Sequence, residues 1–553
     1  MKDEKIRIIP LGGVEEVGKN CTVFEYLPSN KQDKEIIVVD MGFDFPGPDL
    51  PGIDYILPDI NYLKKNKDKI KGIVITHGHL DHVGAIPYFL KDLGSPVFYG
   101  TPLTLGIIKE RLQEEKIKEK EVNLKTMLPG EEFSLGSFKI SPFQVVHNIP
   151  DSTGLIINTP LGNIVHTGDF KIDEQPVDQK PLSKKKLKEV GRKGVLALLS
   201  DSTNATLPGH STPEKEVGKI IDKIVQQAPQ RIIFTTFSTL ISRIQQVIYA
   251  CHKNQRKIVL IGMSMKKSIS LAQDLGYLKT FPGIFIELKD ISDYADKKLL
   301  FLAAGAQGGE GSSMDKISDN KHWGLKVKKG DTVVFSSSTI PGNELAIHKT
   351  MDGLVNQGAK IIYRSVLGSG VHSSGHAFQD ELKEMINIFQ PKFFIPVEGQ
   401  HYMQASHIDL AQERGVAKEN CFMLYNGQIL EINAQLQARV LKNKIPCKII
   451  AVEGGKVNIL DEQNLKIRRQ IIESGICFLT ALKNKKEIKI EIFFQGITIK
   501  EELLIKVKQK AKNLINKYNG SSKKKFINKM QNSLSDFILS KTGKKPLVII
   551  VVN

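Results

Sequence analysis

Three histidines and one aspartate stand within six residues of this chain, in the stretch THGHLDHVG from Thr76 to Gly84. Imidazole nitrogens and carboxylate oxygens are the ligands that zinc and similar divalent ions prefer in proteins. Leu80 is the only large apolar residue between His77 and His82, so the stretch has little to offer a hydrophobic core. The alternative interpretation, a solvated polar loop, leaves this density of metal ligands unexplained. The stretch therefore predicts a metal centre.

The neighbouring elements would hold this cluster in place. Residues 71–76 are a β-branched run that predicts a buried strand, and residues 84–93 predict a short helix. The cluster would then lie on a strand-to-helix loop, where a rigid scaffold presents side chains to a cleft. Asp40 ends another predicted strand, 35–40. It would either support a histidine of the cluster from behind or simply cap a turn.

Composition limits the class of protein. The chain has 553 residues, of which 41% are hydrophobic, and this length predicts two or three domains. We find no apolar run long enough to span a membrane and no apolar signal-peptide region at the N-terminus. Five cysteines are scattered without a CxxC pair, which argues for a reducing compartment and against thiolate zinc sites. We expect a cytoplasmic protein.

The net charge of +18 is unevenly distributed. Residues 441–553 contain 24 Lys and Arg against 9 Asp and Glu, so +15 of the charge lies there and only +3 in the first 440 residues. A basic module on a nearly neutral body suggests a polyanionic partner. The alternative is that these lysines only solvate exposed helix faces.

The middle and the end of the chain differ in their expected secondary structure. Residues 195–375 alternate strands with helices, which indicates βαβ units and a parallel sheet. Residues 441–553 predict a small αβ domain with an amphipathic helix over 501–518. Its last strand, 546–552, needs a sheet partner, either within the domain or in a second subunit.

Several motifs carry a family resemblance. The HGHLDH motif resembles that of the metallo-β-lactamase fold, in its two-metal hydrolase branch. The Ser-Gly-His-Ala turn after the inserted αβ region resembles the β-CASP branch, which acts on nucleic acids. Within that branch the chain is similar to the ribonuclease J family, from about residue 6 to the C-terminus, most specifically at residues 11–20, 51–60, 335–344 and 372–377.

The resemblance implies a fold and a division into domains. We expect an α/β protein with a four-layer αββα metallo-β-lactamase fold, an inserted doubly wound β-CASP domain and a small αβ C-terminal domain. The metallo-β-lactamase domain would comprise residues 1–208 and a return segment, 372–440. The β-CASP domain would occupy residues 209–371, and the basic αβ domain residues 441–553.

The resemblance also implies a site for two divalent ions. One ion would be held by His77, His79 and His147, the other by Asp81 and His82, with Asp169 as a bridge. We expect Zn²⁺, with Mn²⁺ or Mg²⁺ as alternatives at the second site. Two such ions activate water and neutralise phosphoryl oxygens. The expected catalytic residues are His376, as general acid to the leaving oxygen, Asp81, and Asp201 as a supporting acid.

RNA contacts are expected at two turns. Ser373, Ser374 and Gly375, together with His372 and His376, would cradle a phosphate, although Ser-Ser-Gly is also an ordinary turn. The second lies within residues 235–243, at a strand-to-helix junction that suits an anion. The resemblance assigns the 5′-monophosphate end of RNA to this segment, with Phe237, Ser238 and Thr239 as the contacts. The chain departs from the family pattern here, because Leu240 and Ser242 stand where Asn and His are expected.

A second departure concerns the metal site. The family pattern Pro-Val-His-Gly-Glu is Pro-Val-Glu-Gly-Gln here, so Glu398 occupies the position of a histidine ligand. A carboxylate can ligate zinc, manganese or magnesium. His401, three residues on, is an alternative donor, unless a helix that starts there points it elsewhere.

These observations lead to one main hypothesis and two alternatives. We expect a metal-dependent ribonuclease with 5′–3′ exonuclease and additional endonuclease activity on 5′-monophosphorylated single strands, in mRNA decay and rRNA maturation. We expect a homodimer, a homotetramer or a hetero-oligomer with a paralogue. The first alternative is a weakly active RNA-binding subunit of a ribonuclease complex. The second, a hydrolase of small esters or thioesters, leaves the inserted domain and the basic tail without a role.

Overall fold

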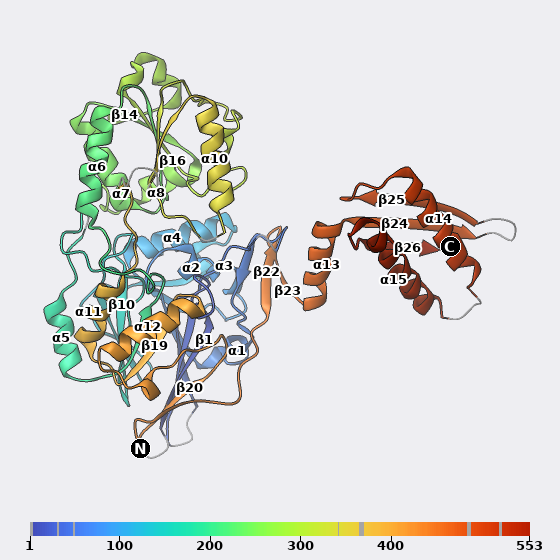
Figure 1. Ribbon diagram of the computed structural model, residues 1–553. Coiled ribbons are helices and arrows are strands. Elements are labelled where there is room, and N and C mark those ends of the chain that lie inside the picture. The colour runs from blue at the N-terminus through green and yellow to red at the C-terminus, as the bar shows by residue number, and fades with distance from the viewer. Residues whose placement is uncertain are drawn as a thin grey trace. The chain divides into compact units, whose positions relative to one another are not determined.

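The computed structural model describes residues 4–29, 33–47, 50–177, 179–340, 342–363, 370–483, 488–518 and 522–552 (Figure 1). The chain forms two compact units. One combines Met1–Asp44 with Ile56–Cys447, and the other combines Phe45–Tyr55 with Lys448–Asn553. Among the described residues, no helix has the length and the apolar character needed to cross a membrane.

Two sheets form the centre of the first unit. The eight-stranded sheet has the order β21-β20-β1-β2-β3-β5-β6-β7. Its strands are β1 Lys5–Gly12, β2 Cys21–Leu27, β3 Glu35–Val39, β5 Ile70–Val74, β6 Val97–Gly100, β7 Asn123–Thr126, β20 Leu430–Asn433 and β21 Ala438–Val440. The six-stranded sheet has the order β19-β12-β11-β10-β9-β8. Its strands are β8 Phe133–Leu135, β9 Phe138–Gln144, β10 Thr153–Thr159, β11 Gly162–His166, β12 Val195–Asp201 and β19 Phe393–Val397.

The two sheets pack face to face between helices. Ile8 and Phe24 of one sheet share a fully buried cluster with Ile157 and Ile395 of the other, so burial of apolar surface holds the layers together. Helices α5 (Lys184–Arg192), α11 (Gln379–Phe389) and α12 (His401–Glu413) pack on the outer face of the six-stranded sheet. Helix α4 (Pro102–Glu114) lies against β6 and β7. The predicted αββα fold is confirmed.

The inserted region forms a third sheet, in which all strands are parallel, in the order β15-β14-β16-β13-β17-β18. Apolar clusters cover both faces, α6–α8 on one and α9 and α10 on the other, as a parallel sheet requires. The doubly wound domain is therefore confirmed. Its elements are β13 Ile232–Thr235, β14 Lys257–Ile261, β15 Phe285–Ile286, β16 Leu299–Ala303, β17 Thr332–Phe335, β18 Lys360–Ile362, α6 Glu214–Gln227, α7 Ile241–Lys253, α8 Met263–Asp274, α9 Ser313–Ser318 and α10 Glu344–Asn356.

The helix predicted over 84–93 is wrong in its bounds. A first short helix, α2 (Leu80–Val83), begins inside the histidine motif, and a second, α3 (Ile86–Phe89), follows it. Pro87 stands at the second position of α3. Proline has no N–H to continue the hydrogen bonds of a preceding helix, but it is well tolerated in a first turn. The motif is thus partly helical rather than a simple loop.

The second unit contains the basic C-terminal module. A hairpin of β22 (Ile449–Glu453) and β23 (Lys456–Leu460) is followed by α13 (Glu462–Ser474) and by the sheet β25-β24-β26. Its last strand, β26 (Leu547–Val552), pairs in parallel with β24 (Ile476–Lys483), so the terminal strand finds its partner within its own domain. The remaining elements are β25 Ile488–Gln495, α14 Glu501–Asn516 and α15 Lys523–Thr542, whose apolar faces cover one side of the sheet.

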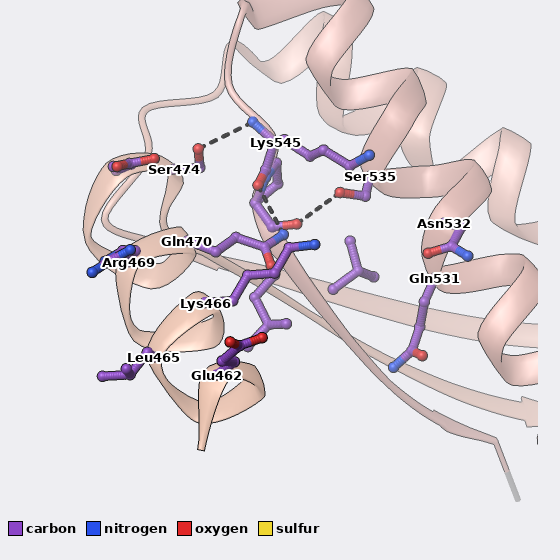
Figure 2. A pocket seen from close by; sticks show the side chains of 14 residues that line it. Glu462, Leu465, Lys466, Arg469, Gln470, Ser474, Gln531, Asn532, Ser535 and Lys545 are labelled. Carbon is purple, nitrogen blue, oxygen red and sulfur yellow. Dashed lines mark hydrogen bonds between the residues drawn. The ribbon is translucent and has the colours of Figure 1, made fainter. Parts of the chain in front are cut away.

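A groove of about 1020 Å³ runs between α13, α15 and the start of β26 (Figure 2). Two hydrogen bonds tie its walls to the chain before β26. The Gln470 Nε2 group donates to the Lys545 carbonyl over 3.1 Å, and the Ser535 hydroxyl donates to the Pro546 carbonyl over 2.9 Å. Cations and amides line it: Lys466, Arg469, Gln470, Gln531, Asn532 and Lys545, together with the anions Glu462 and Glu473.

Candidate metal centre

Parallel strands bring the predicted ligands together. In one sheet, β3 and β5 are parallel neighbours, and Asp40 and His77 follow their carboxyl ends. In the other, β11, β12 and β19 are parallel neighbours. Their carboxyl ends lead to Asp169, Asp201 and Glu398. Because parallel strands end at the same sheet edge, residues that are far apart in sequence meet at one site.

The first group comprises the three histidines assigned to one ion. His79 Nδ1 lies 3.1 Å from His77 Nε2 and 3.1 Å from His147 Nε2. His77 and His147 are buried, whereas His79 is half-buried. One ligand atom of each lies within 4.8 Å of the others, so the three imidazoles can converge on a single cation.

Asp169 occupies the centre of the cluster. Its Oδ2 atom lies 3.6 Å from His77 Nε2, 3.4 Å from His82 Nε2 and 3.7 Å from His147 Nε2. The residue is 2% exposed. A carboxylate at this distance from His77 and His147 on one side and from His82 on the other is where a bridging ligand would stand.

The second group comprises Asp81, His82 and Glu398. Glu398 is 2% exposed. Its Oε1 accepts a hydrogen bond of 3.0 Å from the Gly18 amide, while Oε2 has no hydrogen-bond partner among the described residues. The backbone is left-handed, with φ of 54°, a conformation that costs energy in a non-glycine residue. A buried carboxylate oxygen without a donor, beside two further ligands, fits a bound cation.

His401 lies elsewhere. It is the first residue of α12, its ring stacks edge-on with Tyr425 at 4.6 Å, and its Nε2 lies 3.9 Å from Glu15 Oε1. Of the two alternatives left open by the sequence, the structure brings Glu398 and not His401 to the cluster.

Two histidines are oriented from behind. Asp40 Oδ2 accepts from His82 Nδ1 at 2.8 Å, and its Oδ1 accepts from the Thr76 amide at 2.8 Å. The Gly375 carbonyl accepts from His147 Nδ1 at 2.9 Å. Since these oxygens can only accept, Nδ1 carries the proton in both rings and Nε2 is left as the ligand atom. The first interpretation of Asp40, support of a histidine, is the one that the structure favours.

His376 reaches the cluster from the return segment. Its Nδ1 donates to Asp201 Oδ2 at 2.8 Å and lies 4.0 Å from Asp169 Oδ2. Asn204, which the sequence did not single out, donates to Ser374 Oγ at 2.8 Å and to the His376 carbonyl at 3.1 Å. The only signal for Asn204 was its position in the turn after a strand that ends at Asp201.

Burial and neighbouring charges lower the pKa of some groups in the cluster and raise that of others. Burial and then the adjacent histidines lower the pKa of His77 and His147 well below its usual value, and burial lowers that of His79 to about 4. These rings are therefore neutral at pH 7, as ligands must be. Burial also disfavours a charged His376, but the carboxylate of Asp201 outweighs it and raises the pKa to about 9. Burial, followed by the charge of Asp169, raises the pKa of Glu398 well above its usual value.

The two predicted phosphate-binding turns differ in accessibility. Phe237, Ser238 and Thr239 lie half-buried between β13 and α7, at the carboxyl edge of the inserted sheet. In the other turn, His372 and Ser373 are buried, while Ser374 and His376 are partly exposed. A Cβ on Gly375 would lie 2.5 Å from the Asn148 amide nitrogen and 2.7 Å from His147 Cε1, so only glycine lets the turn approach the site this closely.

Known proteins match this chain along its whole length. Family models match at residues 37–191 (beta-lactamase superfamily domain), 229–354 (ribonuclease J, beta-CASP domain), 369–424 (Zn-dependent metallo-hydrolase RNA specificity domain) and 464–553 (ribonuclease J C-terminal domain). Ribonuclease J of Thermus thermophilus is 36% identical over 99% of this chain and 95% of its own. Ribonuclease J2 of Bacillus subtilis is 35% identical over 99% and 98%, and ribonuclease J of Synechocystis is 39% identical over 91% and 77%. The chain belongs to the ribonuclease J family.

A solved structure supports the fold alone. A protein of unknown function from Enterococcus faecalis superposes with a TM-score of 0.52 at 15% identity, covering 79% of this chain and all of its own. The resemblance drawn from the sequence motifs is thus confirmed at the level of the ribonuclease J family and of the metallo-β-lactamase fold. The exact domain limits, the ligand set and the nature of the metal stay predictions.

Proposed function

We propose that this member of the ribonuclease J family hydrolyses RNA phosphodiesters with the help of two divalent metal ions. The observation that carries the proposal is the convergence of the two donor groups on the Asp169 carboxylate, in a chain that matches ribonuclease J relatives over almost their full length. Two donor groups that share one buried carboxylate suit a pair of ions acting on the same phosphate.

The residues suit two ions of different hardness. His77, His79 and His147 would hold the first, preferably Zn²⁺, while Asp81, His82 and Glu398 would hold the second, with Asp169 shared. When bound, the ions would supply Lewis acidity at the phosphoryl oxygens and lower the pKa of water. The additional carboxylate of Glu398 favours Mn²⁺ or Mg²⁺ at the second site, because hard cations prefer oxygen ligands.

His376 is proposed as the general acid. The Asp201 carboxylate keeps its ring protonated at neutral pH and fixes its orientation. A protonated imidazole beside the metal ligands can donate to the leaving oxygen of the scissile phosphate. Phe237, Ser238, Thr239 and the turn at 372–375 would position the RNA strand and its 5′-monophosphate.

The C-terminal module is proposed as a second contact for RNA, through the groove in Figure 2. Lys466 and Arg469 stand three residues apart on α13 and both line the groove, to which α15 contributes the amides of Gln531 and Asn532. Replacing both by Ala should weaken RNA binding and flatten its salt dependence. The matched control replaces Lys506 and Lys508, which are exposed on α14 outside the groove. Equal losses in the two double variants would show that the charge acts diffusely and that the groove has no special part.

The finer features of the function rest on the family resemblance. We propose 5′–3′ exonuclease activity with additional endonuclease activity, in mRNA decay and rRNA maturation, by a homodimer, a homotetramer or a hetero-oligomer with a paralogue. All five cysteines are unpaired, which supports the proposed cytoplasmic location. The test is incubation with RNA carrying a label at either end, where the order of product lengths separates exonucleolytic from endonucleolytic cleavage.

A second candidate function is a weakly active RNA-binding subunit. Glu398 in place of histidine, and Leu240 and Ser242 at the start of α7 where the family pattern has Asn and His, favour it. The two candidates differ in turnover: a partner subunit would bind RNA with its metals in place, but cleave it far more slowly alone than when mixed with a second family member.

A further inference from the structure

A chain of fully buried charges connects the inserted domain to the turn that carries His376. Arg243 on α7 and Lys171, two residues after Asp169, are both 0% exposed. Glu214, the first residue of α6, lies between them. Arg243 Nη2 donates to Glu214 Oε2 at 2.9 Å, and Lys171 Nζ lies 3.5 Å from Glu214 Oε1. Asp173 Oδ2, 3.8 Å from Lys171 Nζ, balances the second cation.

Both cations of this chain of charges donate hydrogen bonds to residues 371–373, where the inserted domain ends and the return segment begins. Arg243 Nη1 donates to the Val371 carbonyl at 2.7 Å, a carbonyl that also accepts from the Ser336 hydroxyl at 2.6 Å. Lys171 Nζ donates to Ser373 Oγ at 3.0 Å, and that hydroxyl donates in turn to the Thr212 carbonyl. The Ser373 hydroxyl is therefore used inside the fold, whereas the sequence assigned it to a phosphate.

Residues 371–373 lead directly to Gly375 and His376. Two residues after Ser373, the Gly375 carbonyl orients His147, and the next residue is His376. The Lys171 backbone amide donates to the Val146 carbonyl at 2.7 Å. Lys171 thus touches three segments: the one that ends in His147, the one that contains Asp169 and the one that contains His376.

A buried charge is costly unless it is paired, and removal of one member of a buried ion pair leaves the other charge without compensation. Glu214 is firmly ionised: burial raises the pKa of its carboxyl, but Arg243 and Lys171 outweigh burial and lower the pKa to about 2. We propose that Lys171, Glu214 and Arg243 are positioning residues. They hold residues 371–376, where the inserted domain ends and the return segment begins, against the metal ligands, so that the inserted domain sets the place of His376 and of the Gly375 carbonyl. This inference rests on the proposed function.

The experiment compares Lys171→Met with a matched control, Arg231→Met. Arg231 forms a buried ion pair with Asp331 in the inserted domain, 2.5 Å from Nη2 to Oδ2. Its hydrogen-bond partners among the described residues, Asp331 and the Lys326 carbonyl, both lie outside the return segment. Both variants leave a buried carboxylate short of a partner, so both should lower the melting temperature. Only Lys171→Met should lower kcat, by up to about tenfold, because the Lys171 ammonium acts on His147 through Ser373 and Gly375, one step further back than the direct partners of ligands, whose loss costs about 10- to 100-fold. KM should stay nearly unchanged.

A readout that does not depend on RNA separates this proposal from the proposed function. Because the Gly375 carbonyl orients His147, Lys171→Met should also weaken zinc binding, by up to about tenfold in competition with a chelator, while Arg231→Met should not. If wild-type protein with bound metal fails to cleave RNA, the proposed function fails, but the zinc comparison still decides the positioning role. Equal kcat and equal zinc affinity in folded Lys171→Met and wild type would overturn the proposal.

Two further variants guard against a Lys171→Met protein that does not fold. Lys171→Met/Asp173→Asn removes one charge of each sign and is judged by the same two readouts. Arg243→Lys keeps a charge against Glu214, but one ammonium cannot reach both Glu214 and the Val371 carbonyl as the guanidinium does. It should fold and lose part of kcat. A fully active Arg243→Lys protein would contradict the role given to the Val371 contact.

Discussion

Replacing Glu398 tests the residue in which this chain departs most from the family pattern. Glu398→Ala would leave Asp81 and His82, with the shared Asp169, to hold the second ion. Loss of a group one shell behind a ligand already costs 10- to 100-fold in metal affinity. Loss of the ligand should therefore cost at least about 100-fold, or about 2.7 kcal/mol. The variant should retain one tightly bound ion per subunit and cleave RNA slowly.

Glu398→Gln gives a readout in the absence of metal. Burial and the Asp169 charge raise the pKa of the folded carboxyl well above the value of 4.5 expected in the unfolded chain. The stability linked to this proton is present below pH 4.5 and is lost as pH rises through the raised pKa. Metal-free wild type should therefore lose stability towards neutral pH, and Glu398→Gln should lose less. With metal bound, wild type should be more stable than Glu398→Gln, because the ionised carboxylate then ligates a cation.

Glu398→His completes the series. A neutral imidazole at this position should raise zinc affinity at the second site, raise activity with zinc and reduce the dependence on manganese. The assay is metal content per subunit, melting temperature with and without chelator, and cleavage rate with each metal. A Glu398→Ala protein that retains two ions and the wild-type rate would refute the assignment of Glu398 as a ligand.

Three further predictions concern other parts of the fold. His79→Ala and Asp169→Ala should lose one or both ions and all cleavage while the far-ultraviolet circular dichroism spectrum stays that of wild type; an active metal-depleted variant would show that the chemistry lies elsewhere. Asp40→Asn should cost about 10- to 100-fold in metal affinity, because the single amide oxygen can accept from the Thr76 amide or from His82 Nδ1 but not from both as the carboxylate does; unchanged affinity would leave Asp40 as a turn residue. Burial raises the pKa of Asp151 to about 6, although Tyr277 and the Leu103 amide donate hydrogen bonds to it. The contribution of this proton to the free energy of unfolding is fully present below pH 3.8, and it should fall by up to about 3 kcal/mol as pH rises through 6. Asp151→Asn should flatten that fall in denaturant titrations between pH 4 and 7, and an unchanged slope would contradict it.

Much of the site could be predicted from the sequence because its ligands follow parallel strands. His77 and Asp169 each come after a run with clear strand character, and parallel strands gather such residues at one edge. The choice between Glu398 and His401 could not be predicted. It depends on a left-handed residue at 398 and on a helix that begins at His401, and neither leaves a reliable local signal.

The buried ion pairs among Lys171, Glu214 and Arg243 could not be predicted from the sequence either. Lys171 and Arg243 read as two ordinary cations in a chain with 78 Lys and Arg. Only the three-dimensional fold shows that both are fully buried on the same carboxylate, Glu214. The bounds of the helix after the histidine motif were wrong because Pro87 stands in the first turn of a new helix, which begins at Ile86, and does not continue the helix before it. Side-chain pairs across domains carry no periodicity, so a sequence pattern cannot reveal them.

The most direct test of the central claim is one experiment on purified wild type and His79→Ala. Each protein is incubated with 5′-monophosphorylated and with 5′-triphosphorylated RNA, and metal content is measured in the same samples. Wild type should hold two divalent ions per subunit and degrade the monophosphorylated RNA faster, whereas His79→Ala should lose metal and cleavage together. Metal-loaded wild type that leaves both RNAs intact, or a metal-depleted variant that degrades them at the wild-type rate, would contradict the account.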